Sequence, residues 1–223
     1  MRQADPLLAV LASALGLAAA HADGVALDPL KSVAALLLAA PAFMGFRRTV
    51  QRVAGDIAHP VSECIFALLL PALFLLVLTS GTDHFVRGAW SWSAFAAGLP
   101  FALLAACLPL VRGFETRTAD LTAARATLAA VITPMHAKLW LFGLSLPAYL
   151  WLVLQIGRDA LPQACGMALL SLLLSLRAVR VLLEDFEDTD ELARATRFTA
   201  LAAASHGVLL IAGFLLADRL PLF

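Results

Sequence analysis

The sequence predicts an all-α protein whose helices cross a membrane about seven times, and three observations lead to this fold class. Hydrophobic residues make up 61% of the 223 residues and charged residues only 14%, whereas about a quarter of a soluble domain is charged. Long apolar stretches recur along the chain, and none alternates like the strands of a membrane barrel. Because backbone amides in hydrocarbon have no water to bond, helices must carry such stretches. We therefore expect one polytopic helical domain over residues 1–223.

Seven stretches have the apolar composition of a membrane span, which needs about 20 residues, although shorter spans are accommodated by snorkelling or local thinning. The first stretch also looks like a signal peptide, but Asp5 beside Arg2 leaves its start without net positive charge. We therefore expect it to be retained as a span. The predicted spans are residues 6–22, 32–46, 64–80, 90–111, 139–156, 161–183 and 198–217.

Lysine and arginine are distributed unevenly between the two sets of connecting segments. If the segments alternate between the two sides of the membrane, one side holds 12 of these residues and the other holds 4. Positively charged loops stay in the cytoplasm, so we expect the N-terminus inside and the C-terminus outside. The expected location is the inner membrane of a bacterium, in contact with membrane lipids, and the chemistry of the chain should lie at the cytoplasmic face.

Two features exclude other classes of function. No Lys/Arg block is longer than the pair Arg47 and Arg48, so there is no basic footprint for nucleic acid and we expect none as a partner. The three cysteines, Cys64, Cys107 and Cys165, lie far apart in apolar stretches. None of the spacings typical of a zinc site or a redox pair occurs, and we interpret the cysteines as packing residues.

The first cytoplasmic loop carries three arginines, Arg47, Arg48 and Arg52, followed by Asp56 and His59. Guanidinium groups bind phosphate oxygens bidentately, so this loop would hold a lipid phosphate or diphosphate. The alternative is that these arginines only set the topology and contact anionic headgroups.

The second and third cytoplasmic loops carry carboxylates. Glu115 and Asp120 are five positions apart in the second loop, too far round a helix to share a face well, although carboxylates from different loops can converge on one magnesium ion. The third loop has six carboxylates between residues 184 and 191. It is similar to acidic clusters that hold magnesium diphosphate, or it is a solvated loop neutralised by neighbouring arginines.

His206 lies well inside a predicted span, and a polar residue within a membrane is a candidate functional residue. Haem ligation would need a second inward-facing histidine at the same depth, and His136 lies only at the edge of its span. The alternative interpretation is a packing histidine held by hydrogen bonds.

The second half of the chain resembles the UbiA-type superfamily of intramembrane prenyltransferases. In that family a cytoplasmic loop ends in an aspartate, followed by a small residue, a basic residue and a Thr-Leu pair. The matching residues here are Asp120, Ala124, Arg125, Thr127 and Leu128. Three further spans follow, as the family pattern implies.

The first half departs from the family pattern. Asp56 stands for the last aspartate of the family's other motif, but Arg48, Thr49 and Arg52 replace its asparagine and two other aspartates. In the second motif Thr116 replaces the first aspartate, and Glu115 is one position away. The family usually has nine spans, so this chain would be a degenerate and shortened member. In the family the aspartates hold magnesium, which neutralises the departing prenyl diphosphate.

The resemblance implies two alternative functions. In the first, the chain is a prenyltransferase that takes its prenyl group from a diphosphate, with magnesium as cofactor held by Asp56 and Asp120, and with Asp56, Glu115 and Asp120 as catalytic residues. In the second, it is a non-catalytic subunit of a membrane complex that kept the fold and holds a lipid, quinone or pigment. The residues expected to contact the diphosphate are Arg48, Arg52, Arg117, Arg125 and Lys138.

Overall fold

A computed structural model describes residues 4–54, 60–122, 134–184 and 189–217. All regular secondary structure within these residues is helical and no strand occurs there, which confirms the predicted all-α class. The elements are α1 (Ala4–Ala22), α2 (Pro29–Ala54), α3 (Pro60–Arg87), α4 (Trp92–Glu115), α5 (Arg117–Thr122), α7 (Pro134–Gly157), the 3-10 helix η1 (Gln163–Ser171), α8 (Leu172–Glu184) and α9 (Thr189–Leu216).

Six of the described segments are long and apolar enough to cross a membrane. They lie on α2, α3, α4, α7, η1 with α8, and α9, and each overlaps a predicted span. The apolar stretch Pro6–Ala22 of α1 is shorter. At 1.5 Å per residue the 19 residues of α1 are about 28 Å long, close to the roughly 30 Å hydrocarbon core. The chain therefore has the helices of an integral membrane protein, while its seventh crossing stays a prediction.

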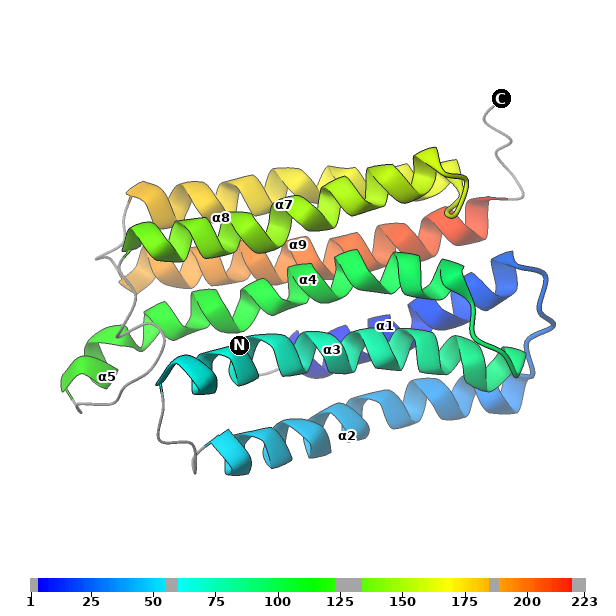
Figure 1. Cartoon of the computed structure of the whole chain (residues 1–223), viewed down its shortest axis with the longest axis horizontal. Helices are drawn as coiled ribbons and strands as arrows, with labels where there is room; N and C mark the ends of the chain where they lie inside the picture. Colours follow the sequence, from blue (N-terminus) through cyan, green and yellow to red (C-terminus); the bar gives the residue numbers. More distant parts are fainter. Residues whose placement is uncertain (1–3, 55–59, 123–133, 185–188, 218–223) are drawn as a thin grey trace.

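The long helices lie side by side along the long axis of the molecule, and the chain direction alternates between neighbours in sequence (Figure 1). As a result α2, α4 and α8 end, and α3, α7 and α9 begin, at the same end of the bundle as the short helix α5. We call this the α5 end. The opposite end holds the turn between α1 and α2, the start of α4 and the start of η1.

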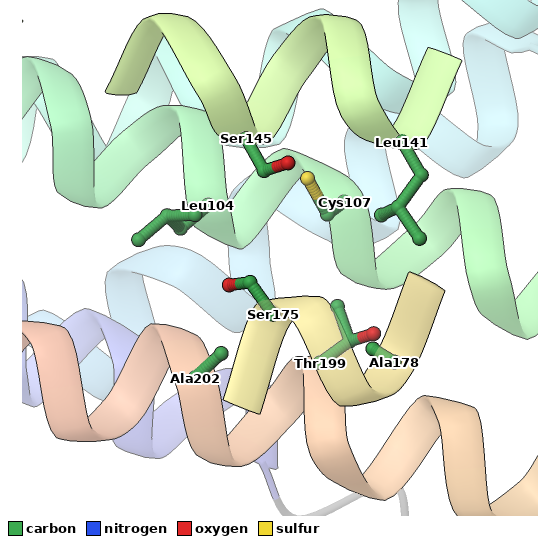
Figure 2. Close-up of a pocket in the computed structure, with 8 residues that line it drawn as sticks. All are labelled: Leu104, Cys107, Leu141, Ser145, Ser175, Ala178, Thr199 and Ala202. Carbon is green, nitrogen blue, oxygen red and sulfur yellow. The ribbon is translucent and has the colours of Figure 1, made fainter. Parts of the chain in front are cut away.

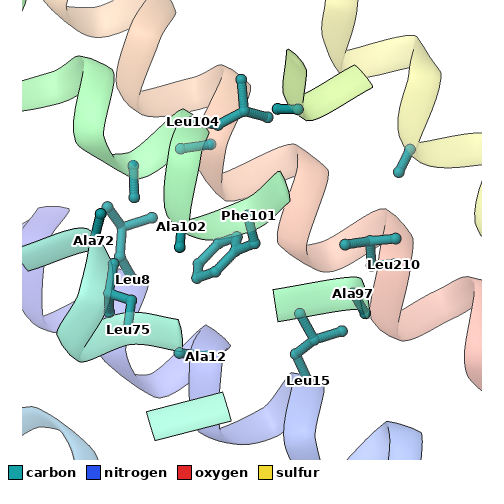
Figure 3. Packing of buried hydrophobic residues seen from close by; sticks show 14 of the residues in the cluster. Leu8, Ala12, Leu15, Ala72, Leu75, Ala97, Phe101, Ala102, Leu104 and Leu210 are labelled. Carbon is teal, nitrogen blue, oxygen red and sulfur yellow. The ribbon is translucent and has the colours of Figure 1, made fainter. Parts of the chain in front are cut away.

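Helix α4 is the centre of the bundle. It packs against α1, α3, α7 and α9, and its apolar residues are mostly buried, whereas those of α2 are mostly exposed. Figure 3 shows the ring of Phe101 among side chains of α1, α3 and α9, including Leu15, Leu75 and Leu210. Most other core residues are alanines, which let helix backbones approach closely in a membrane.

Glycines mark the closest helix contacts. A Cβ atom on Gly16 of α1 would lie 2.3 Å from the carbonyl oxygen of Thr79 in α3, and one on Gly213 of α9 would lie 2.6 Å from Cα of Cys165 in η1. No larger side chain fits at either point without moving the backbone. Helix α9 therefore lies directly on η1, and this contact positions the buried polar residues described next.

Candidate functional site

Three of the residues predicted to form the site lie at the α5 end. Glu115 is the last residue of α4, and Arg117 and Asp120 belong to α5. Asp120 is only 8% exposed, and its Oδ2 accepts a hydrogen bond from the Thr116 hydroxyl at 3.1 Å. Oε1 of Glu115 is buried and has no hydrogen-bond partner in the part of the chain that the structure describes. A buried carboxylate oxygen without a partner is costly and calls for a cation or a donor.

The other predicted site residues are more dispersed. Lys138 is half-buried on α7, which packs against α4. Arg48 is exposed on α2, a helix that packs against α1 and α3. The side chain of Arg52, and all of Asp56 and Arg125, lie outside the described residues.

The predicted magnesium site has a partial fit to the residues present. Glu115 Oε1 offers an oxygen ligand without a partner, but Asp120 already accepts from Thr116. No group of three His, Cys, Asp or Glu side chains close enough to hold a metal occurs within residues 4–54, 60–122, 134–184 and 189–217. Because Asp56 falls in one of the gaps, the site built from Asp56 and Asp120 stays a prediction.

The acidic third loop is described only in part, since residues 185–188 lie in a gap. At the start of α9, Arg194 donates a hydrogen bond to Glu191 within an ion pair. A neighbouring arginine thus neutralises one of the six carboxylates, as the solvated-loop interpretation expects.

A cluster of buried polar side chains lies between α7, η1, α8 and α9 around His206. His206 is fully buried, with Nδ1 3.0 Å from the Ser171 hydroxyl and 3.3 Å from the Ala168 carbonyl oxygen. The Tyr149 hydroxyl lies 3.1 Å from the Ser171 hydroxyl and 2.8 Å from that of Ser175. The rings of Tyr149 and His206 meet edge to face, with centroids 5.6 Å apart. His206 is therefore held by hydrogen bonds inside the bundle.

Sequence reasoning identified His206 but missed its partners. Ser171 and Ser175 are four positions apart and therefore share one helix face. That spacing within an apolar span was an available signal for an inward polar face. Nothing in the sequence paired these serines with Tyr149, because the contact depends on how α7 packs against α8.

A small hollow continues from this cluster toward the α5 end, between α4, α7, α8 and α9 (Figure 2). Its volume of about 10 Å³ gives room for roughly one water molecule. The hydroxyls of Ser145, Ser175 and Thr199 and the thiol of Cys107 line it, together with apolar side chains. Nearer the α5 end, the apolar side chains of Val111, Phe114, Leu141 and Leu182 pack into one cluster. The hollow suits water and not a prenyl chain.

A third set of polar residues connects α3, the turn after α1 and the start of α4 at the opposite end of the bundle. The Arg87 guanidinium contacts Asp83 in α3 at 2.8 Å and Asp23, after α1, at 2.6 Å. The Ser93 hydroxyl, at the start of α4, donates to Asp23 at 2.7 Å. Asp83 is fully buried, so this arginine neutralises a carboxylate that water does not reach. The geometry is that of a structural clamp.

Comparisons of the chain with protein-family models, with curated proteins and with solved structures find no match. The chemistry must therefore be argued from the residues of this chain. The buried cluster is internally satisfied except at His206 Nε2. In the clamp, Asp83 Oδ2 also has no hydrogen-bond partner among the described residues, but Arg87 already supplies the cation for that carboxylate. The α5 end, with Glu115, Arg117, Asp120 and Lys138, is the region whose side chains suit an external ligand.

Proposed function

We propose that this chain is a bacterial inner-membrane protein of the UbiA type that binds the diphosphate of an isoprenoid at its α5 end. It crosses the membrane seven times, with its N-terminus and the α5 end in the cytoplasm. The observation that carries the proposal is Glu115 Oε1, which is buried without a partner among the described residues. A metal cation bound to a diphosphate would satisfy this oxygen, because magnesium takes one or two protein carboxylates together with phosphate oxygens.

The neighbouring residues divide into two roles under this proposal. Asp120 and Asp56 would complete the magnesium ligands beside Glu115. Arg117 and Lys138, with the arginines Arg48, Arg52 and Arg125, would contact the phosphate oxygens directly. Bound magnesium would supply charge neutralisation of the departing diphosphate, and the basic side chains would hold the diphosphate in place and add to that neutralisation.

A second candidate function is a non-catalytic subunit of a membrane complex that holds a lipid, quinone or pigment. A groove of about 300 Å³ between α2 and α3 favours it. Alanines of α2, including Ala35 and Ala39, form one wall, and Phe74, Val77 and Leu78 of α3 form the other. The apolar lining of this groove suits a hydrocarbon tail or an apolar helix. The hollow inside the bundle, in contrast, has no comparable space for a prenyl chain.

One experiment separates the two candidates. The purified chain is incubated with magnesium, labelled prenyl diphosphates and a mixture of quinone and aromatic acceptors, and both binding and diphosphate release are measured. A prenyltransferase gives product and released diphosphate, and Glu115→Gln abolishes both. Binding without release supports the non-catalytic alternative with a diphosphate site.

The matched control is Glu191→Gln, which removes a carboxylate at the same end that is already paired with Arg194. It should leave binding unchanged. If neither the wild-type chain nor the control binds prenyl diphosphate, the diphosphate site does not exist and the proposal is wrong.

A further inference from the structure

One exposed face of η1 and α8 combines leucines with two arginines. Leu170, Leu173 and Leu176 are 63%, 64% and 47% exposed, and Arg177 and Arg180 are exposed beside them. Their three- and four-residue spacings place all five on one side of the helix. With Leu174 they line a hollow of about 550 Å³, a size within the range of ligand pockets.

The depth of Arg177 requires an explanation. Like Arg180, it lies inside the candidate membrane span Gln163–Leu182. Arg177 precedes Glu184, the last residue of α8, by 7 positions, or about 10 Å along the axis. An exposed guanidinium at this depth is unfavourable unless it snorkels to the headgroups or meets an anion. The buried face of the same helix, with Ser175 and Ala178, is already packed in the bundle.

A lipid phosphate suits these two arginines. Side chains three positions apart on a helix lie about 5–6 Å from each other at Cβ, so Arg177 and Arg180 can reach one phosphate group. Guanidinium groups bind phosphate oxygens bidentately. The leucines extend from the arginines toward the middle of the span, where a hydrocarbon chain would lie. The arginines thus lie where the headgroup of a phospholipid would be, and the leucines lie where its acyl chain would be.

We propose that this face, defined by Leu170, Leu173, Leu176, Arg177 and Arg180, is a binding site for an anionic phospholipid. Its phosphate pairs with the two arginines, and one acyl chain lies along the leucines. Only the assignment to the cytoplasmic leaflet rests on the orientation proposed above. The site is separate from the Glu115 region, so loss of one does not imply loss of the other.

The test reconstitutes the full chain in nanodiscs containing equal amounts of phosphatidylglycerol and phosphatidylcholine. After detergent extraction, the lipids retained by the purified protein are measured by mass spectrometry. We expect the wild-type chain to be enriched in phosphatidylglycerol. Because each basic residue near an anionic lipid contributes about 1 kcal/mol, Arg177→Gln should reduce the enrichment about fivefold, and the double variant with Arg180→Gln should reduce it further.

Two controls keep the result interpretable. Arg158→Gln, at the opposite end of the bundle, and Arg197→Gln, on α9, remove exposed arginines outside the hollow and should leave the enrichment unchanged. Arg177→Lys keeps the charge without bidentate geometry and should give an intermediate value even if the glutamine variants fold poorly. Equal phosphatidylglycerol enrichment in Arg177→Gln, Arg177→Lys and the controls would overturn the proposal. The proposal would also fail if a second copy of the chain occupied this face and the protein retained no excess of phosphatidylglycerol.

Discussion

The contact between α1 and α3 at Gly16 predicts a specific cost for adding a single methyl group there. In Gly16→Ala the new Cβ would lie 2.3 Å from the Thr79 carbonyl oxygen and 3.0 Å from Cβ of Thr82. The carbonyl belongs to the backbone of α3 and cannot rotate away. Reaching even 3.0 Å requires the two helices to separate by about 0.7 Å at this point.

That separation also affects the hydrogen bond between Ser13 and Thr82. The bond is 3.1 Å long and buried, and the same shift would lengthen it to about 3.8 Å, beyond hydrogen-bond range. Overpacking costs about 1–3 kcal/mol, and the lost bond adds about 0.6 kcal/mol, a typical value between membrane helices. The higher helix propensity of alanine returns up to about 1 kcal/mol. We expect a net loss of about 1–3 kcal/mol in the free energy of unfolding.

The measurement is equilibrium unfolding of the purified chain in mixed micelles, followed by helical circular dichroism. Gly143→Ala is the matched control, because a Cβ at this glycine in α7 would meet nothing within 4 Å. It should be neutral or slightly stabilising. If Gly16→Ala is as stable as Gly143→Ala, α1 does not pack on α3 at the described distance and the reasoning fails.

Two further predictions concern the buried polar groups. Arg87→Gln leaves the fully buried Asp83 without its ion-pair partner and should cost about 3–5 kcal/mol of unfolding free energy. Adding Asp83→Asn removes the unpaired charge and should recover part of this loss. A double variant no more stable than Arg87→Gln would contradict the clamp. Tyr149→Phe removes a hydroxyl that contacts two serines and should cost about 1 kcal/mol, measured by the same unfolding assay. An unchanged stability would show that the Tyr149 hydroxyl makes no net contribution.

The sequence was sufficient to predict the helical class and the approximate spans, because both depend on local composition. The boundaries were less accurate. The predicted span 32–46 corresponds to a helix that extends over Pro29–Ala54, well past Arg47 and Arg48. Backbone hydrogen bonding continues through these charged residues because their side chains reach the headgroups while the backbone stays helical. Hydropathy therefore marks the end of the apolar residues, and it does not mark the end of the helix.

The 3-10 geometry of η1 was also not predictable. Residues 161–183 read as one apolar span, yet the structure divides this region into Gln163–Ser171 and α8. A 3-10 run of this length is uncommon, and here it coincides with the close approach of Gly213 to the backbone of Cys165. The change from α-helical to 3-10 geometry thus occurs at a tertiary contact, and the local helix propensity of the sequence carries no information about that contact.

The polar contacts between distant segments explain why the candidate site was only partly predicted. Asp23 and Arg87 are 64 positions apart, and Tyr149 and Ser175 are 26 apart. Such pairs form only when particular helix faces meet, and several partners were equally plausible from the sequence. Glu115, by contrast, was predicted as a candidate because it lies one position from an aspartate of the family motif that the chain resembles, although its buried, unpartnered oxygen was not predictable.

The orientation of the α5 end is tested most directly by labelling single cysteines in intact spheroplasts with a membrane-impermeant maleimide. The background chain has alanine in place of Cys64, Cys107 and Cys165. One probe is Thr118→Cys, exposed on α5, and the other is Ala26→Cys, exposed between α1 and α2 at the opposite end. We predict that Ala26→Cys reacts in intact spheroplasts and that Thr118→Cys reacts only after lysis. Labelling of Thr118→Cys before lysis would contradict a cytoplasmic α5 end and, with it, the proposed diphosphate site.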